Sequence, residues 1–144
     1  ERQKAEKTIV FSFYPAEDIP LLHGRVIDFQ QIFLNVMLNS IQAIEAQGEI
    51  RVESHYHCRN RQIQISISDD GPGIPEAIRD KVFDPYFSTK RSGTGLGLFV
   101  VRRALNRYGG EIHFYPRTPH GSICHINLPY MEEHRDGGQV CTKF

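Results

Sequence analysis

The stretch "RSGTGLGLFVVRRAL", residues 91–105, joins a glycine-rich loop to a helical pattern without a break. The glycines stand at every second position, at Gly93, Gly95 and Gly97, and a helix is predicted from Leu96 to Tyr108, where "GG" ends it. A loop that leads into a helix N-terminus presents unpaired backbone N–H groups, which favour a bound anion. We therefore expect a phosphate site here. The alternative is that the glycines only form a flexible, closely packed turn.

The spacing of these glycines excludes the two commonest nucleotide motifs. The stretch lacks the G-x-x-x-x-G-K-[ST] pattern of a P-loop. It also fails the G-x-G-x-x-G pattern, because Leu98 stands where that pattern needs its last glycine. The kind of phosphate ligand must therefore be inferred from other segments.

Alternating and helical patterns divide the rest of the chain into a small set of elements. Strands are predicted at 8–14, 49–57, 61–69, 111–115 and 122–128, and further helices at 28–46 and 75–81. This order predicts an α+β fold: a two-layer α/β sandwich with a mixed, mostly antiparallel sheet and helices on one face. We expect the domain to span 8–130, with 1–7 the end of a linker and 131–144 a disordered tail.

Composition narrows the classes of partner. The 144 residues carry no net charge, so no overall field draws the chain to nucleic acid or to anionic lipid. Its three cysteines have no C-x-x-C spacing, which is typical of a reducing compartment. No apolar run approaches the roughly 20 residues that a membrane-spanning helix needs. We expect a cytoplasmic fragment of a longer protein, itself without direct membrane or nucleic acid contact, although the parent can be membrane-anchored.

A pair of acids ends the strand at 61–69 and leads into "GPGIP". Asp69 continues the face of Ile63, Ile65 and Ile67, whereas Asp70 falls on the opposite face. Asp69 is therefore predicted to point toward the interior, where a carboxylate needs hydrogen-bond donors. An adenine amine is one candidate donor. The alternative is that Asp69 only caps the turn with its own backbone.

The helix predicted at 28–46 has apolar residues around most of its circumference, so we expect it to be well buried, with Asp28 as its N-cap. The remaining arc is a polar stripe that holds Asp28, Gln31, Asn35, Asn39 and Gln42. Amide oxygens are suitable ligands for magnesium, which takes its other oxygens from water and phosphates. The alternative is a stripe that only faces solvent.

Together these segments resemble the catalytic ATP-binding domain of sensor histidine kinases, within the GHKL superfamily of gyrase, MutL and heat-shock chaperone ATPases. "NVMLNSIQAI" is similar to the asparagine box of that family, "DDGPGI" to its first glycine box, "VFDPYFSTK" to its phenylalanine box and "GTGLGL" to its second glycine box. The resemblance covers roughly residues 8–130 and implies a Bergerat-type ATP-binding fold. Four motifs in this order are specific where one alone is weak.

The resemblance implies roles for particular residues. Asp69 would accept the adenine amine, Gly71 and Gly73 would let the backbone approach the base, and Asn39, with Asn35 second, would hold magnesium. The nucleotide-binding set that it implies is Asn35, Asn39, Asp69, Gly71, Gly73, Ile74, Lys90, Arg91, Thr94, Gly95, Leu96, Gly97 and Leu98, with Gly93 also in the glycine loop. Asn39, Asn35 and Lys90 would be the catalytic residues.

The lid between the last two boxes is short, only "KRS" at 90–92. Lys90 or Arg91 would lie close to the β- and γ-phosphates, the alternative being a solvated basic pair. The ending "FSTK" is similar to the "TTK" of nitrogen-regulation-type kinases, which favours Lys90.

The resemblance also bears on the reaction. Related ATPases carry a glutamate base where this helix has Asn35, so transfer of the γ-phosphate is favoured over hydrolysis. None of the seven histidines lies in an H-E-x-x-N-P-like box. The acceptor histidine is therefore expected on a separate dimerisation domain of the parent protein. That domain would form the homodimer, and its phosphohistidine would serve a response regulator. The isolated chain is not expected to phosphorylate itself. The alternatives are a non-catalytic nucleotide-binding regulatory or scaffold domain and, less favoured, a serine-directed anti-sigma kinase.

Overall fold

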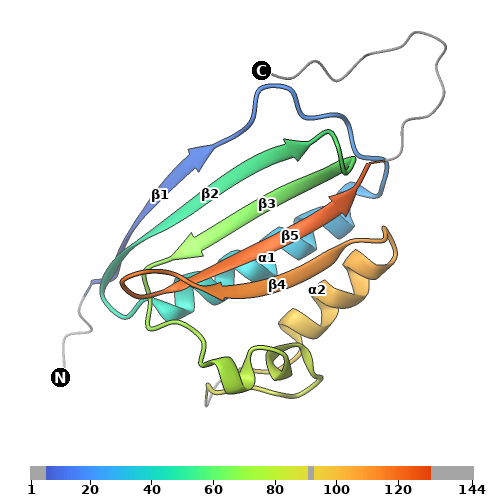
Figure 1. Ribbon diagram of the computed structural model, residues 1–144. Coiled ribbons are helices and arrows are strands. Elements are labelled where there is room, and N and C mark those ends of the chain that lie inside the picture. Colours follow the sequence, from blue (N-terminus) through green and yellow to red (C-terminus); the bar gives the residue numbers. More distant parts are fainter. Residues whose placement is uncertain (1–5, 91–92, 131–144) are drawn as a thin grey trace, which may run out of the picture.

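A computed structural model describes residues 6–90 and 93–130, which form one five-stranded sheet with both α-helices on the same face (Figure 1). The strands are β1 (Thr8–Tyr14), β2 (Gln47–His57), β3 (Gln62–Asp69), β4 (Glu111–Pro116) and β5 (Ser122–Pro129). The helices are α1 (Val26–Ala43) and α2 (Gly97–Asn106), with short 3-10 turns η1 (Glu76–Ile78) and η2 (Lys81–Phe83) between β3 and α2. The predicted two-layer α+β class is confirmed.

The sheet is mixed, in the order β1-β2-β3-β5-β4. β1 and β2 are parallel, and α1 makes the crossover that a parallel pair requires. The other three pairings are antiparallel. In the β3–β5 pairing Asp69 lies opposite Ser122, so the end of β3 lies beside the start of β5 in the middle of the sheet.

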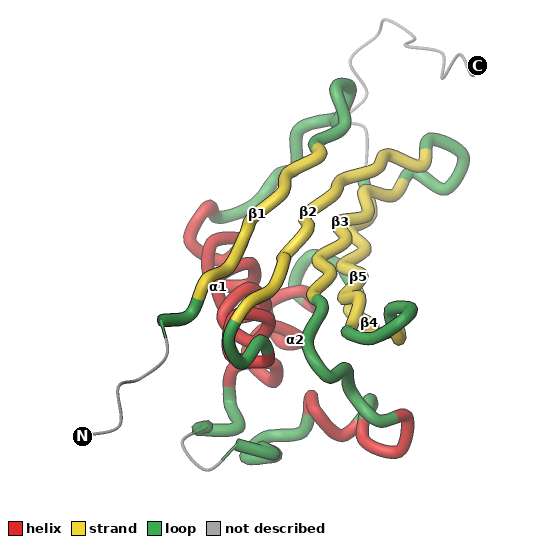
Figure 2. Tube along the Cα trace, turned by 90° about the vertical axis from the view of Figure 1, so that its left-hand side faces the viewer, coloured by secondary structure: helices red, strands yellow, loops and turns green. Residues whose placement is uncertain are grey.

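The core lies between the sheet and the two helices. Alternate residues of β3 and β5 point toward the helices, and most of them are almost completely buried, as are residues on the facing sides of α1 and α2. They include Ile63, Ile67, Ile126, Leu128, Ile32, Val36, Val101 and Leu105. Full burial of one such side chain contributes about 1.5–3 kcal/mol, so this layer fixes α1 and α2 against the sheet. Figure 2, a view turned by 90°, shows that no helix of the described residues covers the opposite face of the sheet.

The boundaries of α1 differ from the prediction. The helix begins at Val26, so Asp28 lies in its first turn and is not the N-cap. The Asp28 carboxylate is buried and instead accepts hydrogen bonds from the Tyr108 hydroxyl and the Arg107 guanidinium. The helix ends at Ala43, because the next residue, Ile44, is extended and buried. In each case a tertiary contact outweighs the local helix signal.

The expectation that α1 is well buried holds only for the side of the helix that faces the core. Leu34 and Leu38 remain 59% and 41% exposed, because the sheet covers only one side of the helix. The helix predicted at 75–81 is replaced by η1 and η2, and α2 is shorter at both ends than the predicted 96–108.

Several sequence-based expectations concern positions outside the described residues. They are the expected tail at 131–144, most of the expected linker at 1–7, and Arg91. Among residues 6–90 and 93–130, no helix combines the length and the hydropathy that crossing a bilayer requires.

Candidate nucleotide-binding site

Asp69 ends β3 and is only 3% exposed, as the strand parity predicted. Its Oδ1 accepts the backbone N–H of Gly71 at 3.0 Å, and its Oδ2 accepts the Ser122 hydroxyl at 2.8 Å. The carboxylate therefore does cap its own turn. Each carboxylate oxygen has a second lone pair, so Asp69 can still accept a donor from a ligand.

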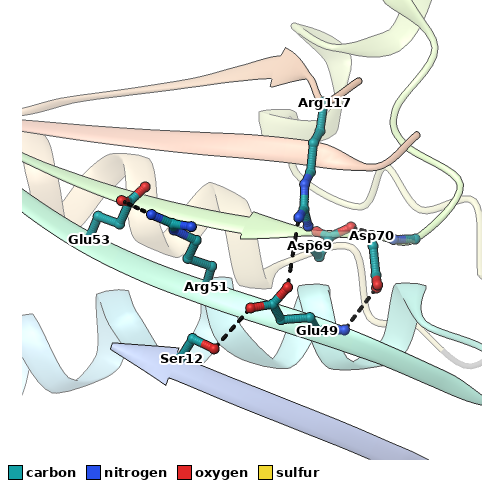
Figure 3. A network of polar contacts seen from close by, with 8 residues as sticks. Ser12, Glu49, Arg51, Glu53, Asp69, Asp70 and Arg117 are labelled. Atoms are coloured by element: carbon teal, nitrogen blue, oxygen red, sulfur yellow. Dashed lines mark hydrogen bonds and ion pairs between the residues drawn. The ribbon is translucent and has the colours of Figure 1, made fainter. Parts of the chain in front are cut away.

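The neighbouring acid, Asp70, has a different contact. Its Oδ1 accepts the backbone N–H of Glu49 on β2 at 3.0 Å, and Figure 3 shows this bond on the side of the sheet away from the helices. Glu49 in turn accepts the Ser12 hydroxyl and faces the Arg117 guanidinium at 3.9 Å. Asp70 therefore ties the strand ends together, and only Asp69 points into the fold.

The segment that follows, residues 70–75, is the β3 loop, and it is held between α1 and the β4–β5 turn. A Cβ at Gly71 would lie 3.1 Å from both the Cβ and the carbonyl oxygen of Ala43, the last residue of α1. Gly73 has φ +81°, and a Cβ there would lie 2.8 Å from the carbonyl oxygen of Gly121. Glycine at these positions is what lets the β3 loop approach both neighbours this closely.

Asn35 and Asn39 lie one turn apart on α1, and both are half-buried. The Asn35 amide nitrogen donates to the carbonyl oxygen of Gln31 at 2.9 Å, which leaves its Oδ1 free to accept a donor or bind a cation. Within the described part of the chain, the Asn39 side chain makes no hydrogen bond. This stretch of the stripe therefore offers amide oxygens that the fold itself does not use.

The N-terminus of α2 faces the same part of α1. A Cβ at Gly97, the first residue of α2, would lie 3.4 Å from the Oδ1 of Asn35. No side chain among the described residues caps α2, so its first N–H groups remain available to an anion. Leu98 is buried in the core and can contribute only its backbone. Thr94 accepts the Leu96 N–H at 3.4 Å, which shapes the entry to the helix.

Residues 93–97, the glycine loop, are joined to the segment after η2. The Tyr86 N–H donates to the Gly95 carbonyl oxygen at 2.8 Å, and both residues have positive φ. A Cβ at Gly95 would lie 2.4 to 2.8 Å from backbone atoms of Tyr86. Gly95 is therefore required by the close approach of two backbones, and the glycine loop is anchored at this point rather than freely flexible.

The Lys90 side chain contacts α1, but further along the helix than Asn35. Its Nζ donates to the Oε1 of Gln42 at 2.8 Å. Ser88 fixes the backbone of Lys90 from both sides, accepting its N–H at 3.1 Å and donating to its carbonyl oxygen at 3.2 Å. Partial burial lowers the pKa of Lys90, Lys7 lowers it further, and Asp69 opposes both effects.

Helix α1 thus brings the separate motifs together. Asn35 meets the start of α2, Gln42 meets Lys90, and Ala43 meets the β3 loop. In residues 6–90 and 93–130 no three His, Cys, Asp or Glu side chains are grouped so that they could hold a metal ion.

The sequence profile of the family described as histidine kinase-, DNA gyrase B- and HSP90-like ATPase matches residues 24–132. The chain belongs to this family. Within it, this histidine kinase-type ATPase domain is 40% identical over 100 residues to the signal transduction histidine-protein kinase AtoS of Escherichia coli. The aligned region covers 69% of the chain and 16% of AtoS. It is 32% identical over 136 residues to the sensory histidine kinase/phosphatase NtrB of Rhodobacter capsulatus. This aligned region covers 87% of the chain and 38% of NtrB.

Solved structures agree with this membership. The catalytic domain of histidine kinase ThkA shares 30% identity with a TM-score of 0.74, over 84% of this chain and 78% of that one. The mycobacterial sensor kinase MprB shares 28% identity with a TM-score of 0.75, over 84% and 81% of the two chains. The histidine kinase-type ATPase domain spans well under half of the curated relatives it matches.

Two residues of this site were not predicted as site residues from the sequence. Ser122 reaches Asp69 through the β3–β5 pairing, which joins strands 53 residues apart, so no local pattern indicates it. Gln42 belongs to the predicted polar stripe, but its contact with Lys90 depends on how the segment after η2 folds back onto α1.

Proposed function

We propose that this histidine kinase-type domain binds magnesium-ATP and transfers the γ-phosphate to a histidine on a separate dimerisation domain. The observation that carries the proposal is the convergence on α1: within about two turns, the helix meets the β3 loop, Lys90 and the uncapped N-terminus of α2. These contacts supply a buried acceptor for a base at one end and backbone N–H donors for phosphates at the other.

The residues present fit an adenine nucleotide. Asp69 retains acceptor capacity beside Gly71, where a side chain would fill the space next to Ala43. An exocyclic amine satisfies such a buried acceptor, and the backbone of Gly71, Gly73 and Ile74 can approach a flat ring closely. At the other end, Thr94 and Gly95 to Leu98 would surround the phosphates, and Lys90 would supply a cation.

The amide oxygens of Asn35 and Asn39 fit magnesium, which prefers oxygen ligands and keeps several of its waters. Asn39 would be the protein ligand, and Asn35 would orient the ion or its water. When bound, the ion neutralises charge on the transferring phosphate. The side chains themselves position the phosphates and supply no proton, because a carboxamide is not a base at neutral pH.

Phosphoryl transfer needs mainly positioning and charge neutralisation, so the acceptor can come from another domain. The kinase ThkA has been crystallised with the response regulator TrrA, and it shares 26% identity with this chain. By analogy, we propose a dimerisation domain of the same parent and a response regulator as partners, with residues 8–130 as the catalytic unit in the cytoplasm.

The test uses γ-labelled ATP with magnesium, the chain, and the histidine-bearing domain of its parent expressed separately. Acid-labile label should appear on the added domain and not on the chain alone. Label on the chain itself, or acid-stable label on the acceptor, would contradict histidine-directed transfer. Tight nucleotide binding with no transfer at all would favour a regulatory or scaffold domain.

A further inference from the structure

The position of the Lys90 ammonium does not match the phosphate end of the site. That end is marked by the start of α2 at Gly97, which lies against Asn35. Lys90 instead contacts Gln42, seven residues further along α1. At 1.5 Å per residue the two contacts are separated by about 10 Å along the helix. Lys90 therefore lies toward the end of the site that holds Asp69.

We propose that Gln42 is a positioning residue that holds Lys90 away from the phosphate end, and that nucleotide binding breaks this contact so that the ammonium can meet a phosphate oxygen. The inference rests on the proposed function, because it names a control step of the same site. The Gln42 carboxamide is a neutral acceptor on an exposed helix face, whereas a phosphate is a charged acceptor that binds an ammonium more strongly.

The surroundings of Lys90 favour this exchange. The ammonium of Lys7 donates to the Ile41 carbonyl oxygen, so a second cation is fixed one residue from Gln42. Partial burial and this like charge both lower the pKa of Lys90, which means that its charged form is poorly stabilised there. Asp69 is the one opposing charge among the causes of the shift, and a bound adenine would engage it.

The backbone around Lys90 is held in a tight turn by local hydrogen bonds. Ser88 bonds the N–H and the carbonyl oxygen of Lys90, and the Gly93 N–H donates to the same carbonyl at 3.3 Å. A Cβ at Gly93 would lie 2.4 Å from the Ser88 Oγ, so the turn is tight. Only the flexible Lys90 side chain has to move when the contact with Gln42 breaks.

The test measures binding of a non-hydrolysable ATP analogue with magnesium to four chains by calorimetry. They are wild type, Gln42→Leu, Lys90→Met and the double variant, with melting curves to show that each is folded. Loss of a competing contact between exposed side chains should raise affinity about two- to fivefold in Gln42→Leu. The gain should vanish in the Lys90→Met background, because a purely structural effect of Gln42 would persist there. Gln30→Leu, an exposed glutamine on another face of α1, should leave affinity unchanged.

The outcomes separate the two proposals. Wild-type chain that binds no nucleotide overturns the proposed function and this inference with it. If the wild-type chain binds the analogue and Gln42→Leu binds it equally well or more weakly, only the proposed role of Gln42 is overturned. An affinity gain of the same size with and without Lys90 also overturns it.

Discussion

Replacing Asp69 by asparagine removes one carboxylate oxygen and leaves the shape of the site unchanged. In the protein both oxygens are in use, with Oδ1 on the Gly71 N–H at 3.0 Å and Oδ2 on the Ser122 hydroxyl at 2.8 Å. An asparagine can keep the first bond and donate to the Ser122 oxygen, so folding should lose only about 1 kcal/mol. Its NH₂ group, however, cannot accept an adenine amine, and its remaining oxygen is an uncharged and therefore weaker acceptor.

The expected loss of nucleotide affinity follows from the type of hydrogen bond that the substitution weakens. A hydrogen bond to a charged acceptor contributes about 1.5–3 kcal/mol, which corresponds to a roughly 10- to 150-fold weaker Kd. The assay is calorimetric titration of Asp69→Asn with a non-hydrolysable ATP analogue and magnesium, supported by a thermal melt of the free protein.

Asp70→Asn is the matched control. This variant makes the same change of charge at the neighbouring residue. Asp70, however, contacts the Glu49 N–H on the other side of the sheet, and an asparagine oxygen can still accept that hydrogen bond. Its Kd should stay at the wild-type value. Equal binding by Asp69→Asn and wild type, or an equal loss in both variants, would refute the assignment of the base-accepting carboxylate to Asp69.

Three further predictions concern neighbouring parts of the fold. Gly95→Ala should weaken nucleotide binding and lower the melting temperature, because its Cβ would lie within 2.8 Å of Tyr86 backbone atoms at φ +69°, and calorimetry with a melt checks both. Ser122→Ala should weaken binding about 2- to 12-fold, since Asp69 loses the donor that orients it; unchanged affinity would show that Gly71 suffices. Burial and neighbouring imidazoles lower the pKa of His125, so its contribution to stability is complete above the unfolded value of about 6.5 and is lost as pH falls through the lower folded pKa. His125→Gln should therefore lose less melting temperature than wild type between pH 7 and pH 5, and an equal loss would contradict this.

Short-range patterns predicted most of the fold and the position of Asp69. Strand parity depends only on neighbouring residues, so the inward direction of Asp69 could be inferred without the partner strands. The ends of α1 could not, because Asp28 is engaged by Arg107 and Tyr108, about 80 residues away.

Long-range pairing accounts for the other differences. The Ser122 contact needs the β3–β5 register, and the Lys90 contact needs the path of the segment after η2. Likewise, the exposed Leu34 looked like core because a helical wheel does not show that the sheet covers one side only. Each difference depends on which elements meet in space, which local sequence does not encode.

The most direct test of the account is a map of backbone amide signals of the labelled chain, recorded with and without a magnesium-bound ATP analogue. The account predicts large shifts confined to the β3 loop, the amide-bearing face of α1 around Asn39, and the start of α2 at Gly97. Saturable binding whose shifts fall instead on the helix-free face of the sheet, or no binding at millimolar analogue, would contradict it.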